Sequence, residues 1–136
     1  MAPAIDIGRA LVVDDDATNR TLAHAYLDAL GWCVDECVDG YSTLAYLRQC
    51  TPALILLDIR MPGLHGTALA KIIRTTHPAG SVRLVAYTAH ATHEEEAYIL
   101  STGFDTMLTK PVSFADFQKV VGEARKNEQP SVSAFL

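Results

Sequence analysis

The chain has 136 residues, of which 49% are hydrophobic and 20% are charged, and its formal net charge is -5. This profile predicts one globular domain and excludes a disordered or fibrous chain. An acidic chain without a Lys/Arg cluster is a poor match for a nucleic-acid surface, because phosphate neutralisation needs grouped cations. No run of about 18 apolar residues occurs, so we expect no membrane span and favour a cytoplasmic location.

Two kinds of segment alternate along the chain. The first is a short, mostly apolar run that predicts a strand, and the second has apolar residues at helical spacing. In chain order, strands are expected at residues 10–13, 32–37, 53–57, 84–87 and 106–109. Helices are expected around apolar stripes at 22–30, from 44 onward, at 69–73, within 93–102 (where Ala97 and Leu100 form the stripe) and at 114–121.

Turn and capping residues agree with this division. Asp16 precedes the first helix as an N-cap, and Gly31 and Gly103 follow the first and fourth helices. Thr92 and Ser113 each have an acidic residue three positions later, which is the spacing of a capping box. The phenyl rings of the last stripe are expected in the core.

Five alternating strands and helices predict an α/β fold with a five-stranded parallel sheet, doubly wound as (βα)5. The strand order 2-1-3-4-5 is favoured, because it puts the two more polar strands, the second and the fifth, at the sheet edges. We assign residues 1–8 to an N-terminal extension, 9–126 to the domain and 127–136 to a flexible C-terminal tail.

Cys33, Cys37 and Cys50 are the cysteines of the chain. Their odd number argues against a disulfide framework and favours a reducing compartment. Cys33 and Cys37 have no second Cys or His pair at zinc-finger spacing, so we expect them to be small buried residues rather than metal ligands.

Polar side chains follow four of the five predicted strands. Asp14 and Asp15 follow the first strand, Asp58 ends the third, Thr88 ends the fourth, and Lys110 follows the fifth. In an open α/β sheet, ligands bind at the carboxyl ends of the strands, near the point where the strand order reverses. These side chains are therefore expected to form one site.

Three converging acids repel one another unless a cation lies among them, and carboxylates without imidazole or thiolate neighbours favour Mg2+. Asp58 can bind the ion through one oxygen and attack phosphorus in line with the other, giving an aspartyl phosphate. Lys110 would stabilise the phosphoryl oxygens. Thr88 would hydrogen-bond the new phosphoryl group and bias the following loop.

The motifs Leu11–Asp16, Leu56–Gly63, Thr88-Ala89 and Lys110-Pro111 occur in this order and together resemble the receiver domain of two-component response regulators. The resemblance extends from about residue 9 to residue 125. The stretch Asp16–Arg20 is similar to receivers of hybrid sensor histidine kinases, so the chain is either a single-domain regulator or a receiver from a longer protein.

The resemblance implies a role for each matching residue. Asp58 would be the phosphoacceptor, Thr88 the switch hydroxyl, and Lys110 the phosphate-contacting lysine, followed by a cis peptide bond. Asp14 and Asp15 would be the acid pair. The Mg2+ ligands would come from Asp15, Asp58 and the backbone carbonyl of Arg60, with Asp14 beside them, and Mn2+ would be able to replace Mg2+.

The resemblance also implies partners. A histidine kinase or a histidine phosphotransfer protein would donate the phosphoryl group at the first helix. A downstream protein would bind the fourth helix, fifth strand and fifth helix, and the chain would be a monomer or weak dimer. It would be no enzyme beyond catalysing its own phosphorylation and dephosphorylation.

Three positions depart from the commonest family pattern or vary within it. Met107 stands where the family often has the aromatic residue that moves with the switch hydroxyl. Arg60 and His90 lie two residues after Asp58 and Thr88, at positions that tune phosphate lifetime in the family. His90 and His93 have metal-ligand spacing but no third ligand, so we expect loop and first-turn residues.

Other functions remain open on the sequence. A Mg2+-dependent phosphatase with an aspartyl nucleophile would have a second Asp two positions later, where this chain has Arg60. A flavin-binding protein of the same strand order would need a phosphate-binding loop after the first strand, where this chain has three acids. A receiver-like module that takes no phosphate is the fourth possibility, and the complete residue set argues against it.

Overall fold

The computed structural model describes residues 3–89 and 91–128. Its strands are β1 (Ile5–Val13), β2 (Cys33–Cys37), β3 (Thr51–Asp58), β4 (Arg83–Thr88) and β5 (Thr106–Thr109). Its helices are α1 (Ala17–Ala29), α2 (Gly40–Leu47), α3 (Gly66–Thr76), α4 (His93–Ser101) and α5 (Phe114–Glu128). The strands form one parallel sheet in the order β2-β1-β3-β4-β5, which confirms the predicted topology.

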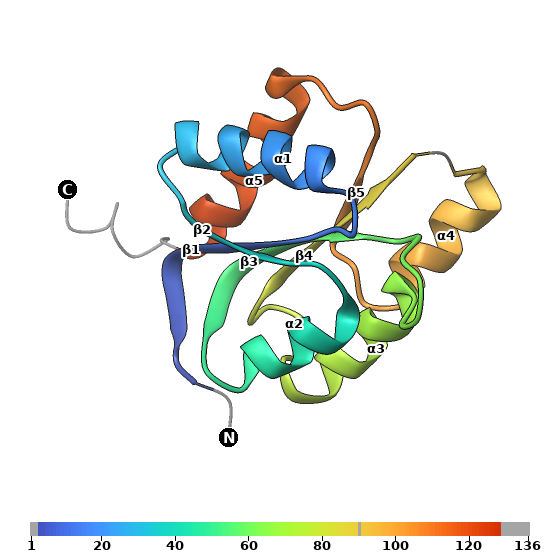
Figure 1. Cartoon of the computed structure of the whole chain (residues 1–136), viewed down its shortest axis with the longest axis horizontal. Helices are drawn as coiled ribbons and strands as arrows, with labels where there is room; N and C mark the ends of the chain where they lie inside the picture. Colours follow the sequence, from blue (N-terminus) through green and yellow to red (C-terminus); the bar gives the residue numbers. More distant parts are fainter. Residues whose placement is uncertain (1–2, 90, 129–136) are drawn as a thin grey trace.

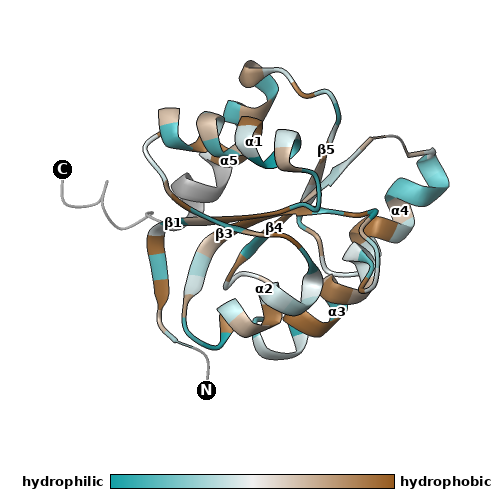
Figure 2. Cartoon of the chain, in the orientation of Figure 1, coloured by the Kyte–Doolittle hydropathy of each residue, from teal (hydrophilic) through white to brown (hydrophobic). Residues whose placement is uncertain are grey.

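Helices cover both faces of the sheet. Figure 1 shows α1 and α5 on one face and α2 and α3 on the other. Every residue of β3 is buried, and Figure 2 shows the apolar residues concentrated along the central strands. A strand covered on both faces has no solvent side, which explains why β3 lacks the polar alternation of a half-exposed strand.

The helices bury different faces from those predicted in three places. In α1, Ala23 and Leu27 are buried, whereas Leu22 of the predicted stripe is exposed. In α4, Ile99 is buried instead of the predicted Leu100. Phe114 is 38% exposed rather than in the core. Apolar residues on these helices fit two adjacent faces, and the angle at which each helix meets the sheet decides between them.

The chain ends differ from the predicted boundaries. β1 begins at Ile5, so residues 5–8 of the predicted extension belong to this strand, and Ile5 and Asp6 pair with the start of β3. The register between β1 and β3 shifts between Asp6 and Ala10. α5 reaches Glu128, and the remainder of the predicted tail lies outside the described residues. Cys33, predicted to be buried, is exposed because β2 is an edge strand.

The predicted N-caps are present, although the Glu95 carboxylate accepts from the Thr92 hydroxyl rather than from the Thr92 amide that a capping box would use. Asp16 accepts a hydrogen bond from the Asn19 amide at 3.1 Å, and Thr92 accepts one from the Glu95 amide at 3.2 Å. Gly31 and Gly103 have φ of 89° and 125°, as left-handed residues after helices do. Within residues 3–89 and 91–128, no helix combines the length and apolar character that crossing a bilayer requires.

Candidate functional site

Three carboxylates meet where the strand order reverses. β1 and β3 are neighbours and Val13 is in register with Leu57, so Asp14 and Asp58 lie side by side at the carboxyl ends. Carboxylate oxygens of Asp14, Asp15 and Asp58 lie within 4.8 Å of one another. Asp14 is 1% exposed and Asp58 is 5% exposed, whereas Asp15 faces solvent. An acidic cluster open on one side can receive a hard cation such as Mg2+.

Lys110 reaches this cluster from the end of β5. Its Nζ donates to Asp14 Oδ2 and to Asp58 Oδ1, each at 3.2 Å. Its backbone amide donates to the carbonyl of Thr88 at 2.7 Å, and the Lys110–Pro111 peptide bond is cis, as predicted. The structure thus brings together all four charged side chains that the strand-end pattern predicted.

Charge is unbalanced at the site, with one ammonium among three carboxylates. Burial raises the pKa of Asp58, and the Asp14 carboxylate raises it further, while Lys110 opposes both effects in part. Burial alone would lower the pKa of Lys110, but the carboxylates of Asp58 and Asp14 together raise it. The lysine is therefore held charged, and the negative charge left over favours binding of a cation.

The raised pKa of Asp58 gives a pH-dependent stability. In the unfolded chain, the Asp58 carboxyl has the ordinary pKa of 3.8. The folded protein therefore binds a proton at Asp58 more tightly than the unfolded chain does. Asp58 therefore costs no stability below pH 3.8, and metal-free protein is expected to lose stability as the pH rises from there through the raised pKa. Urea unfolding in EDTA of wild type and Asp58→Asn measures this. Their difference should grow across the window and then level off; a constant difference would contradict it.

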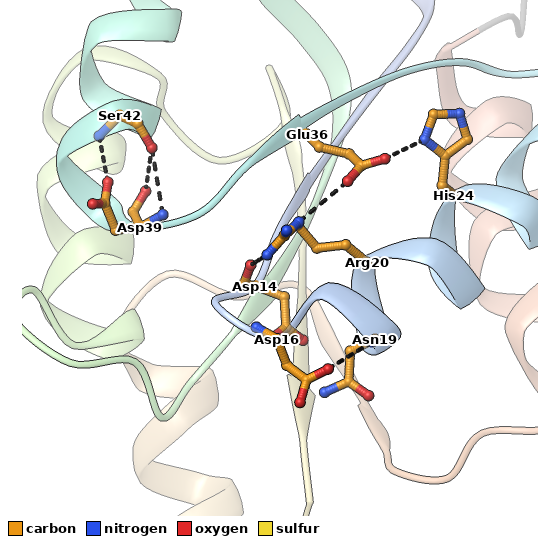
Figure 3. Close-up of polar contacts among 8 residues, drawn as sticks. All are labelled: Asp14, Asp16, Asn19, Arg20, His24, Glu36, Asp39 and Ser42. Carbon is orange, nitrogen blue, oxygen red and sulfur yellow. Dashed lines mark hydrogen bonds and ion pairs between the residues drawn. The ribbon is translucent and has the colours of Figure 1, made fainter.

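The turn that carries the acid pair is held by a polar network that spans α1 and β2 (Figure 3). The Asp14 amide donates to the carbonyl of Cys37 at 3.2 Å, and Arg20 Nη1 donates to the carbonyl of Asp14 at 2.8 Å. Arg20 Nε contacts Glu36 Oε1 at 3.2 Å, and Glu36 Oε2 lies 2.6 Å from His24 Nδ1. The sequence did not predict a role for Arg20 or Glu36, because no sequence spacing indicates a contact between a residue of a helix and one of an edge strand.

The other predicted site residues occupy neighbouring positions. Thr88 is buried at the end of β4, in register with Thr109. Met107 is partly buried and packs against the core cluster on the side of α3 and α4. The Arg60 guanidinium lies 3.5 Å from Glu95 of α4. His90 lies outside the described residues, and the His93 side chain is exposed.

Gly66 lets the β3–α3 loop close tightly behind Asp58. Its amide donates to the Ile59 carbonyl at 2.9 Å, and a Cβ there would lie 2.5 Å from the Asp58 carbonyl oxygen. Gly66→Ala is therefore expected to destabilise the fold by about 1–3 kcal/mol, because backbone rather than a flexible side chain must move. Urea unfolding gives the change. Gly122→Ala, where a Cβ meets nothing within 4 Å, is the control and should be neutral or stabilising; equal effects would contradict the steric explanation.

Known proteins are similar to this chain in sequence and in fold. The model of the response regulator receiver domain matches residues 10–122. The chain is 34% identical over 129 residues to sensor protein GacS of Pseudomonas syringae pv. syringae, covering 90% of this chain and only 14% of that protein. A receiver domain protein from Methanospirillum hungatei has a TM-score of 0.80 at 26% identity, covering 92% of this chain and 99% of its own.

A second solved structure is similar at 28% identity and a TM-score of 0.79, covering 87% of this chain and 97% of its own. It is the receiver domain of a sensor histidine kinase from Pseudomonas aeruginosa with a magnesium ion coordinated in its active-site cleft. The sheet order, the acids at the strand ends and the match to the family model together show that this chain belongs to the response regulator receiver domain family.

Proposed function

We propose that this receiver domain accepts a phosphoryl group on Asp58 in a Mg2+-dependent reaction and thereby switches protein–protein interactions. The observation that carries the proposal is the position of Lys110 Nζ, 3.2 Å from Asp58 Oδ1 and 3.2 Å from Asp14 Oδ2. A surface lysine without a role at the site would extend into solvent rather than contact two nearly buried carboxylates. A cation between the acceptor and its neighbour is suited to binding the equatorial oxygens of a phosphoryl group.

The acid cluster fits a magnesium ion, because its donors are carboxylate oxygens without a thiolate or imidazole. Asp14, Asp15 and Asp58 would hold the ion, together with the backbone carbonyl of Arg60, and Mn2+ would be able to replace it. When bound, the ion supplies charge neutralisation for the transferred phosphoryl oxygens.

In the proposed transfer, the second carboxylate oxygen of Asp58 attacks phosphorus. A P–O bond forms, the bond from phosphorus to the donor imidazole nitrogen breaks, and the electron pair leaves with that nitrogen. Asp58 becomes an acyl phosphate, so the Lys110 ammonium can exchange its contact with the Asp58 carboxylate for one with the phosphoryl oxygens. Thr88 is the proposed hydroxyl donor to the same oxygens, and its change of position would reach α4 through the following loop.

The proposed partners follow from the relatives and the site. One similar solved structure is the receiver domain of a sensor histidine kinase, which supports a histidine kinase or histidine phosphotransfer protein as the donor. The downstream partner would contact α4, β5 and α5, with the chain as a monomer or weak dimer in the cytoplasm. A phosphatase acting on external substrates is disfavoured, since the Arg60 guanidinium, two positions after Asp58, forms an ion pair with Glu95 and offers no general acid.

Acetyl phosphate tests the proposed function. Incubation with Mg2+ is expected to add one phosphoryl group per chain, seen by intact mass spectrometry, and beryllofluoride is expected to bind with Mg2+. EDTA should remove both effects, because three carboxylates without a divalent cation repel the incoming phosphate. Labelling that is unaffected by EDTA would contradict the Mg2+ requirement. Rapid multiple turnover of a small phosphoester would favour the phosphatase instead.

A further inference from the structure

A buried aromatic ring lies beside the ammonium of Lys110. The Nζ atom is 4.8 Å from the centroid of the Tyr87 ring, and Tyr87 is 3% exposed. Tyr87 is in register with Asp58 on β3 and with Leu108 on β5. Tyr87 therefore lies on the strand between the acceptor strand and the strand that Lys110 follows, and the ammonium lies over its ring where it reaches Asp58.

The Tyr87 ring is part of a buried cluster on one face of the sheet. Tyr87 belongs to the core cluster on the α1 and α5 side of the sheet, which also contains Phe117 and contacts Tyr26. Tyr26 meets Phe117 edge-on at 5.2 Å and Phe114 edge-on at 5.1 Å. Burial raises the pKa of the Tyr87 hydroxyl, so the phenol stays neutral and does not form an ion pair with the lysine. What it presents to the ammonium is the negative face of its π system.

We propose that Tyr87 is a positioning residue for Lys110, whose ammonium it holds over the acceptor carboxylate by a cation–π contact. The contact of Lys110 with the Asp58 carboxylate depends on the negative charge of that carboxylate, which is replaced by charge on the phosphoryl oxygens when the acyl phosphate forms. The ring contact does not depend on that charge, and a cation–π contact is strongest where water is excluded. Tyr87 would therefore keep the lysine over the site while its oxygen partners change. This inference rests on the proposed phosphoacceptor function.

Fluorination of the ring separates this role from simple core filling. Tyr87→Phe is expected to accept phosphate from acetyl phosphate at a rate within about twofold of wild type, because it retains the ring face. Mono-, di- and trifluorophenylalanine at position 87 should then lower the rate stepwise, to about tenfold below phenylalanine for the trifluoro ring, since fluorine weakens the quadrupole with little change of volume. A ring that only fills space gives the same rate across the series, and that result would overturn the proposal.

The chain offers a control pair at the surface. Lys71 Nζ lies 5.4 Å from the centroid of Tyr98, and both residues are exposed. Tyr98→Leu should leave the labelling rate unchanged, whereas Tyr87→Leu should lower it about tenfold. Equal rates for the two leucine variants would also overturn the proposed role.

A second readout needs no phosphorylation. In carbon–proton correlation spectra of the metal-free protein, the Cε protons of Lys110 should be shifted upfield by the Tyr87 ring current and return to ordinary values in Tyr87→Leu. An ordinary shift in wild type would overturn the placement of the ammonium over the ring. If wild type shows the upfield shift but takes no phosphate, the proposed function fails. If it takes phosphate but the fluorinated series is flat, only the role of Tyr87 fails.

Discussion

Asp58→Asn is expected to abolish phosphoryl labelling and to leave a folded protein. The amide of asparagine has no carboxylate oxygen to form the acyl phosphate. The other acids of the cluster are not expected to replace Asp58 as the acceptor, because their carboxylates occupy different positions. Asp14 is buried with Oδ2 on Lys110 and Oδ1 on the amide of Asp16. The variant should also be more stable than wild type in EDTA. Burial and the Asp14 carboxylate raise the pKa of Asp58, which means that they destabilise its ionised form, and a neutral amide does not carry that cost.

Intact mass after incubation with acetyl phosphate and Mg2+ gives the labelling, and urea unfolding in EDTA gives the stability. Asp28→Asn is a matched control, because Asp28 is an exposed carboxylate on α1, and it should be labelled at the wild-type rate. Labelling of Asp58→Asn at the wild-type rate would assign the acceptor to another residue. A loss of labelling together with a loss of folding would show only a structural role for Asp58.

Arg74→Ala is expected to cause a large loss of folding stability. Its guanidinium joins the end of α3 to the loops that lead into β4 and β5. Nε donates to the carbonyl of Gly103 at 2.8 Å, and Nη2 contacts Asp105 at 3.0 Å. Nη1 lies within hydrogen-bond distance of three further carbonyl oxygens, those of His77, Pro78 and Val82.

Removing this side chain leaves a carboxylate and several backbone carbonyls without their charged donor. Partly buried groups of this kind cost about 1–3 kcal/mol each when water cannot fully replace the donor, so a total loss of about 3 kcal/mol is expected. For a domain of this size, that corresponds to a fall in melting temperature of about 10 °C. Calorimetry or thermal circular dichroism measures it.

Arg48→Ala is the control for Arg74→Ala. Arg48 is exposed at the end of α2, and its removal should change the stability by no more than about 0.5 kcal/mol. Similar losses in both variants would mean that the guanidinium hydrogen bonds of Arg74 contribute little beyond the packing of its stem.

The sequence alone predicted the fold and the charged residues of the site. The unbroken apolar run in β3 requires a strand covered on both faces, and alternation with helices then requires parallel pairing. Parallel strands put all their carboxyl ends at one edge, so Asp14, Asp58 and Lys110 had to converge once the strand order was known. Covalent order and backbone geometry were sufficient for these conclusions.

Other features depended on how the helices pack. The buried faces of α1 and α4 differ from the predicted stripes because the contact angle with the sheet, rather than periodicity, selects Leu27 and Ile99. The sequence carries no signal that marks Arg20 or Arg74 as contacting another segment. Each is placed against backbone carbonyls of distant segments only after the helices dock.

Tyr87 shows most clearly the difference between what the sequence predicts and what the tertiary structure decides. Its place in an apolar strand predicted burial and nothing more, since any large apolar residue would satisfy the pattern. Only the pairing of β5 beside β4 in the folded chain brings the ammonium of Lys110 to 4.8 Å from its ring. The strand-end pattern determines which charges meet, because it is set by local backbone direction. Side-chain contacts across separate elements, which hold those charges in position, are decided by tertiary packing.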